Sequence, residues 1–210
     1  MDRERITISI KKEVLKMIDK AIDGVDLRNR SHAIESLVLN ALNSNAPIKA
    51  VILLGGDSAI KTTDRAIDFI KTLHGYGINE VIIATGFLGD KVKDKITKAD
   101  LGDISIKFSD KGEGSGGAIL ALKKELTDGI FIVYNNAKAG EYNLTSLIDF
   151  HKDHNSIATL LTDDLESMEG IYLFDQSVFN TFPKGYSMLE EDIVPKLVKT
   201  GDLLVCPIIS

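Results

Sequence analysis

The chain has very little of what marks a secreted, disulfide-bonded or membrane-spanning protein. Its 210 residues include one cysteine, Cys206, and no tryptophan. A single cysteine excludes an intrachain disulfide framework and argues against a cysteine-based metal site. No apolar run approaches the roughly 20 residues of a membrane span, and the charged start MDRER lacks the apolar stretch of a signal peptide. We therefore expect a globular, cytoplasmic protein with no membrane partner.

The acidic charge is concentrated in one part of the chain. The formal net charge is −6. Residues 1–46 contain eight Lys/Arg against seven Asp/Glu, whereas residues 47–210 contain seventeen against twenty-four. The break falls at the polar segment NSNAP, which ends in a helix-breaking proline. The sequence therefore predicts two domains, 1–46 and 47–210, and any contact with nucleic acid falls to the less acidic first one.

The first domain shows a strand–helix–helix pattern. Residues 5–10, RITISI, alternate strictly, with three isoleucines on one face. A helical spacing of apolar residues follows in residues 11–23, and a second helix begins at Asn29, a good N-cap residue. About 45 residues make too small a core to stand alone, and a single strand has no partner. We therefore expect a homodimer through the N-terminal strand, with a higher oligomer left open.

This order of elements, over residues 3–43, resembles the ribbon-helix-helix DNA-binding domain of the Arc and MetJ class. The resemblance implies that two chains pair their strands into a ribbon that enters the major groove of double-stranded DNA. The implied base-reading residues are Arg5, Thr7 and Ser9, and the implied phosphate contacts are Asn29, Arg30 and Ser31. The plainer interpretation is a dimerisation module whose ribbon faces solvent.

From residue 48 onwards, predicted strands alternate with predicted helices. Buried strands are expected at residues 49–55, 80–86, 104–110 and 129–135. This alternation predicts a Rossmann-like, doubly wound α/β domain with a mostly parallel sheet. Ligands bind such sheets at the carboxyl ends of the strands, and glycine-rich segments follow three of the predicted strands.

Four stretches in chain order resemble the sugar-phosphate nucleotidyltransferases, which have a Rossmann-like GT-A fold and join a nucleoside triphosphate to a sugar 1-phosphate. They are KAVILLGG, GINEVIIATGFLGDKVKDKI, GEGSGGAILAL and SMLEEDIVPKLVKTGDL. The resemblance implies that the first glycine turn and the glycine loop hold a nucleotide. The implied nucleotide-binding residues are Gly55, Gly56, Lys61, Gly114, Ser115, Gly116 and Gly117. A flexible turn is the plainer interpretation of the loop at residues 112–117.

Three departures from that family pattern point away from catalysis. The loop after Gly56, which carries Arg and Lys residues in the family, is shortened. The position that corresponds to a metal-binding acid is Ala137, whose methyl group cannot coordinate Mg²⁺. The sugar-binding hairpin is reduced to the four residues LESM. Asp175, at the end of a predicted strand, is a weak candidate metal ligand, since a lone acid there is more often a turn residue.

The sequence therefore predicts a DNA-binding transcriptional regulator. Its nucleotidyltransferase-like domain is expected to be a pseudoenzyme that senses a nucleotide or sugar-phosphate effector, with no catalytic residue, no metal and no cofactor. The alternative is a nucleotidyltransferase with residual activity that its N-terminal module dimerises, and only this alternative involves Mg²⁺. A third hypothesis is a scaffold that binds protein partners and no small molecule.

Overall fold

The chain divides into two compact units, Met1–Ala46 and Pro47–Ser210, which are described separately here. The structure is a computed structural model, and it describes residues 7–22, 29–34, 38, 48–56, 59–86, 89–127, 129–138, 140 and 142–207. Within these ranges no helix is both long enough and apolar enough to cross a membrane.

The N-terminal unit contains the predicted first helix as α1, Lys12–Ala21, with Ile18 buried. A second helical segment begins after Asn29, whose side chain accepts a hydrogen bond from the His32 backbone N–H (3.0 Å) and so confirms the predicted N-cap. The predicted strand at residues 5–10 is absent from its described part, residues 7–10. The reason is physical: one copy of this unit offers no second strand to complete the backbone hydrogen bonds of a ladder.

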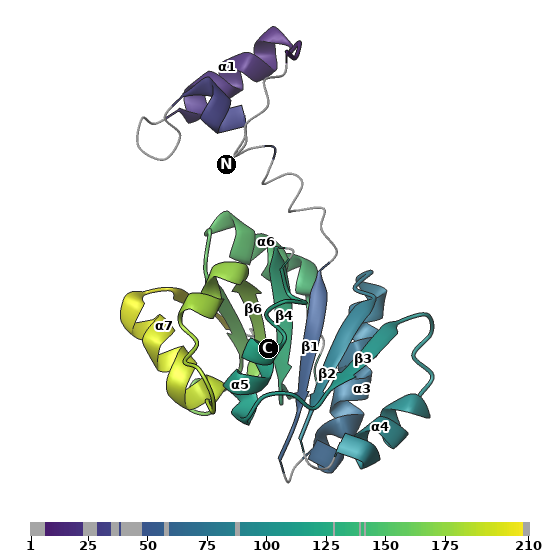
Figure 1. Cartoon of the computed structure of the whole chain (residues 1–210). Helices are drawn as coiled ribbons and strands as arrows, with labels where there is room; N and C mark the ends of the chain where they lie inside the picture. The colour runs from purple at the N-terminus through teal and green to yellow at the C-terminus, as the bar shows by residue number, and fades with distance from the viewer. Residues whose placement is uncertain are drawn as a thin grey trace. The chain divides into compact units, whose positions relative to one another are not determined.

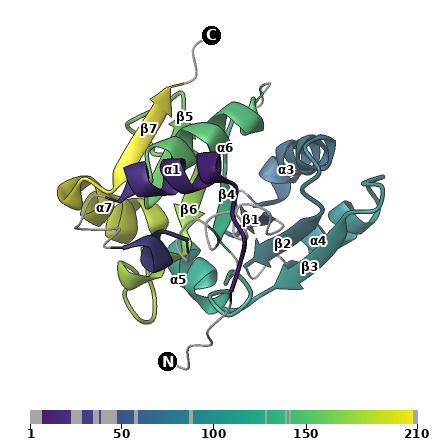
Figure 2. The ribbon, with the colours of Figure 1, turned by 90° about the horizontal axis from the view of Figure 1, so that it is seen from above.

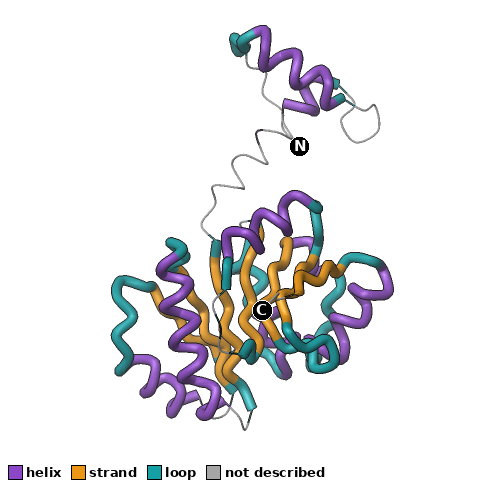
Figure 3. Tube along the Cα trace, turned by 180° about the vertical axis from the view of Figure 1, so that it is seen from behind, coloured by secondary structure: helices purple, strands orange, loops and turns teal. Residues whose placement is uncertain are grey.

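The second unit is built on a seven-stranded sheet in the order β3-β2-β1-β4-β6-β5-β7 (Figure 1). The strands are β1 Lys49–Leu54, β2 Glu80–Thr85, β3 Ser105–Ser109, β4 Ile130–Asn135, β5 Ala158–Thr162, β6 Gly170–Asp175 and β7 Leu203–Pro207. Neighbouring strands, orange in Figure 3, are parallel except where β6 pairs with β4 and β5. The predicted α/β class with a mostly parallel sheet is confirmed.

Helices cover both faces of the sheet. One face carries α3 Ala59–Gly75, α4 Gly89–Thr97 and α6 Leu144–Asp153. The other carries α5 Gly114–Ala121, the 3₁₀-helix η1 Gln176–Asn180, the π-helix η2 Leu189–Ile193 and α7 Val194–Thr200. Figure 2 shows α3 and α6 on one side of the sheet and α5 on the other. Burial on both faces explains why the central strands are continuous apolar runs instead of alternating ones.

The direction of β6 determines which residues reach each edge of the sheet. Asn135 at the end of β4 pairs with Gly170 at the start of β6, and Ile130 pairs with Asp175. Strand β6 therefore begins at the edge where β1, β2 and β4 end, and it finishes at the opposite edge.

Helix α3 starts at Ala59, shortly after the glycine turn that follows β1. The hydroxyls of Thr62 and Thr63 donate to the Ala59 carbonyl oxygen (3.2 and 2.7 Å), so both lie inside the first turns. Lys61 consequently lies on the exposed side of a helix and not in a loop.

A buried histidine couples the stability of this unit to pH. His151 on α6 is 2% exposed, and its Nδ1 lies 2.9 Å from the Thr159 hydroxyl oxygen. Burial lowers the pKa of His151 below its ordinary value. The histidine of the unfolded chain therefore takes up a proton at a higher pH than that of the folded chain, and folding loses stability as pH falls through about 6.5.

We predict that His151→Gln reduces the rise in the free energy of unfolding between about pH 5 and pH 7, because it removes this difference in proton uptake. Urea unfolding at several pH values measures the effect. His154→Gln is the matched control, since it makes the same replacement at an exposed histidine at the end of the same helix. Equal slopes for His151→Gln and the wild type would contradict the prediction.

Candidate functional site

The edge of the sheet at which β1, β2 and β4 end holds a cavity of about 360 Å³. The chain runs from β1 outward through β2 and β3 on one side and continues with β4 on the other. The cavity therefore lies where the strand order reverses, which is the usual ligand position in open α/β sheets. This edge is the lower one in Figure 1.

One wall of the cavity is formed by glycine turns after β1 and β2. Gly55, Gly56 and Gly86 line it. A Cβ atom on Gly86 would lie 3.3 Å from the backbone nitrogen of Gly56, and Gly56 has a φ of 73°. A side chain at Gly86 would therefore require the Gly56 turn to shift by a few tenths of an ångström, and the positive φ of Gly56 favours glycine there. The glycine part of this wall consequently offers backbone groups that a phosphate or a nucleobase can approach directly.

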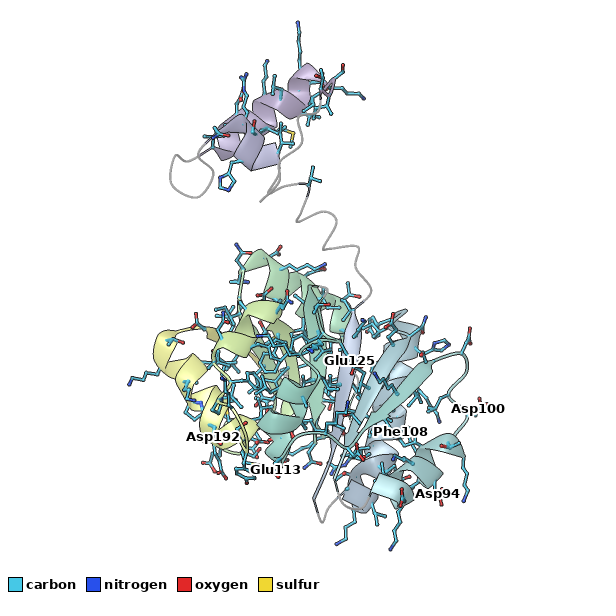
Figure 4. The ribbon with its side chains drawn as sticks, in the orientation of Figure 1. Asp94, Asp100, Phe108, Glu113, Glu125 and Asp192 are labelled. Carbon is cyan, nitrogen blue, oxygen red and sulfur yellow. The ribbon has the colours of Figure 1, made fainter. Side chains whose placement is uncertain are left out.

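The opposite wall is formed where α5 contacts residues 185–190. The backbone N–H groups of Gly116 and Gly117 donate to the Ser187 carbonyl oxygen (2.9 and 3.2 Å), and Ser187 N–H donates to the Glu113 carbonyl oxygen (3.1 Å). Further along, the Asp192 carboxylate accepts from Met188 N–H (2.8 Å). Glu113 and Asp192 are both labelled in Figure 4. The glycine loop is thus held by hydrogen bonds, in contrast to the flexible-turn interpretation.

Two carboxylates that the sequence interpretation missed line this cavity, Glu169 and Glu190. The Glu190 carboxylate accepts hydrogen bonds from the side-chain amide of Asn135 and from the Ser115 hydroxyl (3.2 Å). Ser115 in turn accepts from the Leu189 backbone N–H (2.7 Å). The Glu190 side chain is therefore fixed by β4 and by the first turn of α5.

A second set of hydrogen bonds fixes Glu169. The Asn136 side-chain amide donates to Glu169 Oε1 (2.6 Å), and Arg65 Nη2 donates to Asn136 Oδ1 (2.8 Å). Arg65 lies one turn after Lys61 on α3, so the spacing of the helix could have indicated it. Glu169 could not be found in this way, because its position depends on the direction of β6.

The residues implied by the family resemblance are distributed unevenly around the cavity. Gly55, Gly56, Gly114 and Ser115 line it. Gly116 and Gly117 lie outside the lining, and their N–H groups are used in the contact with Ser187. Lys61 is exposed on α3 and also lies outside the lining.

The two positions considered for a metal have structural roles. Asp175 lies at the opposite edge of the sheet, where its carboxylate accepts from Ser177 N–H (2.8 Å) and caps η1. Ala137 is 4% exposed, and its carbonyl oxygen accepts from the Tyr134 hydroxyl (2.8 Å). Burial raises the pKa of Tyr134 to about 12. Among the described residues no group of three or more His, Cys, Asp or Glu side chains is placed to hold a metal ion.

No model of a known protein family matches the chain. The curated proteins that it is similar to include two from plants. "Probable mannose-1-phosphate guanylyltransferase 1" of Oryza sativa subsp. japonica is 24% identical over 209 residues, covering 74% of this chain and 58% of its own length. "Mannose-1-phosphate guanylyltransferase 1" of Arabidopsis thaliana is 26% identical over 156 residues, covering 62% and 42%. The chain thus spans about half the length of these relatives.

Solved structures show the same architecture. HddC from Yersinia pseudotuberculosis superposes with a TM-score of 0.62 at 18% identity, covering 76% of this chain and 90% of HddC. Its complex with GMP-PN gives 0.60 at 20% identity, covering 76% and 90%. A putative glucose-1-phosphate thymidylyltransferase from Bacillus anthracis, in complex with a sucrose, gives 0.59 at 19% identity, covering 77% and 87%.

The chain contains a nucleotidyltransferase-like domain. The hypothesis of a DNA-binding regulator with a degenerate domain is wrong, because the relatives found are nucleotidyltransferases and none supports a ribbon-helix-helix module. The pseudoenzyme interpretation rested on the shortened loop after Gly56, on Ala137 and on the reduced hairpin, and the relatives found do not support it. The nucleotidyltransferase-like domain instead places Arg65, Glu169 and Glu190 at or beside the cavity from other elements.

The residues assigned to DNA contact lie in the N-terminal unit, and the structure describes all of them except Arg5. Arg5 lies outside the described residues, and Thr7 and Ser9 are exposed without being part of a strand. Asn29 uses its side chain as a helix cap, and the exposed Ser31 follows it inside the helix. The Arg30 guanidinium pairs with both carboxylate oxygens of Asp19 (Nε–Oδ1 2.6 Å and Nη2–Oδ2 2.8 Å).

We predict that Gly114→Ala destabilises the nucleotidyltransferase-like domain far more than Gly185→Ala. Both glycines have positive φ, 75° and 87°, so both changes incur about 1–2 kcal/mol of backbone strain. Only at Gly114 would the new Cβ lie 2.3 Å from the Ser187 carbonyl oxygen, whereas the space around Gly185 is open to 4 Å. Chemical unfolding of the two variants measures the difference, and equal losses of stability would disprove the packing of α5 on residues 185–188.

Proposed function

We propose that this protein is a nucleotidyltransferase that joins a nucleoside triphosphate to a sugar 1-phosphate. The observation that carries the proposal is the cavity at the switch point of the sheet, with a glycine backbone wall facing two fixed carboxylates. The proposal is supported by the names of the relatives, which describe transfer to mannose 1-phosphate and glucose 1-phosphate.

The proposed reaction is an in-line displacement at the α-phosphorus of the nucleoside triphosphate. An oxygen of the sugar 1-phosphate forms the new bond to this phosphorus. The bond from the α-phosphorus to the oxygen bridging to the β-phosphate breaks, and its electron pair leaves with pyrophosphate. Because such a reaction depends on positioning and on neutralising phosphate charge, it needs no reactive side chain. Backbone N–H groups in glycine turns suit the first task, since they can approach phosphate oxygens closely.

The two carboxylates suit a divalent cation that arrives with the nucleotide. Mg²⁺ is commonly held by one or two protein carboxylates together with substrate phosphates, and it neutralises phosphate charge when bound. Glu169 and Glu190 line one cavity and provide two such groups. Asn135 and Asn136 donate to them and thereby restrict their orientation. In this proposal Glu169 and Glu190 take the role that Ala137 cannot perform.

We predict Mg²⁺-dependent release of pyrophosphate from at least one pair among GTP with mannose 1-phosphate and dTTP with glucose 1-phosphate. Glu190→Gln should lower turnover by about 10- to 100-fold, because it removes a carboxylate charge from the cavity while keeping the shape of the side chain. Glu191→Gln is the matched control, since the neighbouring Glu191 is exposed and lies outside the cavity lining. Absence of pyrophosphate release from both pairs would count against the proposal, as would equal losses in the two variants.

The N-terminal unit supports a second, structural role. Its apolar side chains are unusually exposed: Ile8 52%, Val14 45%, Met17 70% and Val38 49%. A unit of this size buries too little apolar surface to be stable alone, so a second copy that covers these side chains would stabilise it. We infer that this unit dimerises the enzyme.

We predict that Met17→Asp weakens dimerisation of the full chain by at least tenfold, because it replaces an apolar side chain of the exposed face with a charge. Lys16→Asp, at the neighbouring exposed polar position of α1, introduces the same side chain and should leave the dimer intact. Sedimentation equilibrium at micromolar concentration measures both variants. A wild-type protein that is monomeric under these conditions would refute the inferred dimer.

A further inference from the structure

Three polar side chains connect helix α3 to the wall of the cavity. Arg65 Nη2 donates to Asn136 Oδ1 (2.8 Å), and Asn136 Nδ2 donates to Glu169 Oε1 (2.6 Å). The three residues come from α3, from the end of β4 and from the start of β6, so the connection joins three separate elements. Each side chain is partly buried, which limits competition from water.

The chemistry of the two end groups fixes the orientation of the amide between them. A guanidinium can only donate hydrogen bonds, and an ionised carboxylate can only accept them. The Asn136 amide therefore has to direct its oxygen to Arg65 and its nitrogen to Glu169. The opposite orientation would place two donors together at one end and two acceptors together at the other. Arg65 thus determines the amide orientation that Asn136 offers to Glu169.

The backbone at Asn136 is also constrained. Asn136 has a φ of 50°, in the left-handed region that asparagine tolerates better than most residues. It forms an isolated bridge with Gly170, the residue next to Glu169. Backbone and side chain of Asn136 therefore both contact the segment that carries the carboxylate. Such sparsely populated conformations persist where the surrounding structure holds them, and they cluster at functional sites.

The charge of Arg65 is not neutralised by a direct ion pair in the part of the chain that the structure describes. The lysines nearby differ in this respect: Lys95 pairs with Asp64 (2.7 Å), and Lys138 pairs with Asp163 (3.0 Å). The single hydrogen bond that Arg65 makes among the described residues is the one to Asn136. The Arg65 guanidinium therefore contacts the Asn136 amide that binds Glu169, and it forms no ion pair with a surface carboxylate among the described residues.

We propose that Arg65 is a positioning residue that acts through Asn136 to hold the Glu169 carboxylate toward the cation of a bound nucleotide. The proposal rests on the proposed nucleotidyl transfer, and it adds a role for a residue that does not itself line the cavity. Without Arg65 the Asn136 amide can rotate, and the carboxylate loses its fixed orientation. The cation then binds more weakly, whereas the glycine wall that contacts the nucleotide is unchanged.

The test compares Arg65→Gln, Asn136→Gly and the double variant. Asn136→Gly breaks the same connection, and glycine adopts the φ of this position without strain. We expect each single variant to need about 10- to 100-fold more Mg²⁺ for half-maximal pyrophosphate release, as is typical when a group that orients a ligand is lost. The double variant should be no worse than either single one, because both changes break one connection. Arg65→Lys should recover part of the loss.

A second readout does not depend on turnover. Binding of Mn²⁺ to the protein with a non-hydrolysable nucleoside triphosphate analogue, followed by electron paramagnetic resonance, should weaken by a similar factor in both single variants. Binding of the same analogue without metal should change less than twofold. Lys71→Gln is the control, since it removes a positive charge from an exposed position of α3. If Arg65→Gln does not fold, Asn136→Gly provides the same comparison.

The outcomes separate this proposal from the proposed function. If the wild type turns over and Arg65→Gln needs no more Mg²⁺ than Lys71→Gln, the positioning role is overturned and nucleotidyl transfer stands. If the wild type releases no pyrophosphate, nucleotidyl transfer fails, and the Mn²⁺ measurement alone decides the role of Arg65. Equal Mn²⁺ affinity in all variants, or no Mn²⁺ binding by the wild type with the analogue, overturns the positioning role.

Discussion

Strand β6 runs against β4, pairing Asn135 with Gly170 at one end and Ile130 with Asp175 at the other, and the composition of the site depends on this pairing. The reversal places Glu169 beside the ends of the parallel strands and places Asp175 at the far edge. It also creates the bridge between Asn136 and Gly170. A parallel β6 would exchange the two acids, bringing Asp175 to the edge that holds the cavity and Glu169 to the far edge.

A second set of contacts maintains the opposite wall. The Ser187 carbonyl oxygen accepts from two consecutive N–H groups at the start of α5, and Ser115 links α5 to both Leu189 and Glu190. Helix η2, a π-helix, begins at Leu189, and such wide turns occur frequently at functional sites. Segments about 70 residues apart in the chain thus form one wall, because glycine at the start of α5 leaves no side chain to separate them.

The sequence predicted the strands of the second unit well, because a strand is indicated by a local run of apolar residues. Continuous apolar runs indicated β1, β2, β3 and β4, and their alternation with helices indicated a mostly parallel sheet. The run GIYLFD was equally clear as a strand, but an apolar run carries no information about direction. This is why Asp175 was considered and Glu169 was overlooked. Lys61 is close to the glycine turn in the sequence, but because α3 starts at Ala59 it lies on the exposed side of the helix, whereas Arg65, one turn later, contacts Asn136.

The functional prediction failed for a different reason. It was based on which family residues are missing, whereas Glu169 and Arg65 lie outside the four stretches that resemble the family and Glu190 lies inside one of them without a role implied for it. The strand predicted at residues 5–10 shows the same limitation at another level, because it is absent from residues 7–10 and one copy of the unit offers no strand to pair with it. Local pattern therefore describes elements reliably, but it does not describe groups that come together only through tertiary or quaternary structure.

The close approach of Gly56 to Gly86 makes the two walls of the cavity unequal in their capacity to evolve. A Cβ atom on Gly86 would lie 3.3 Å from the Gly56 backbone nitrogen, so a substitution there requires the neighbouring turn to shift, and the glycines of this wall offer main-chain groups to whatever lies against them. Tyr186 and Met188 on the other wall contribute side chains that can vary. Substitutions at Tyr186 and Met188 therefore disturb the backbone of the cavity less than a substitution at Gly86 does, and they change the side chains that a bound molecule meets.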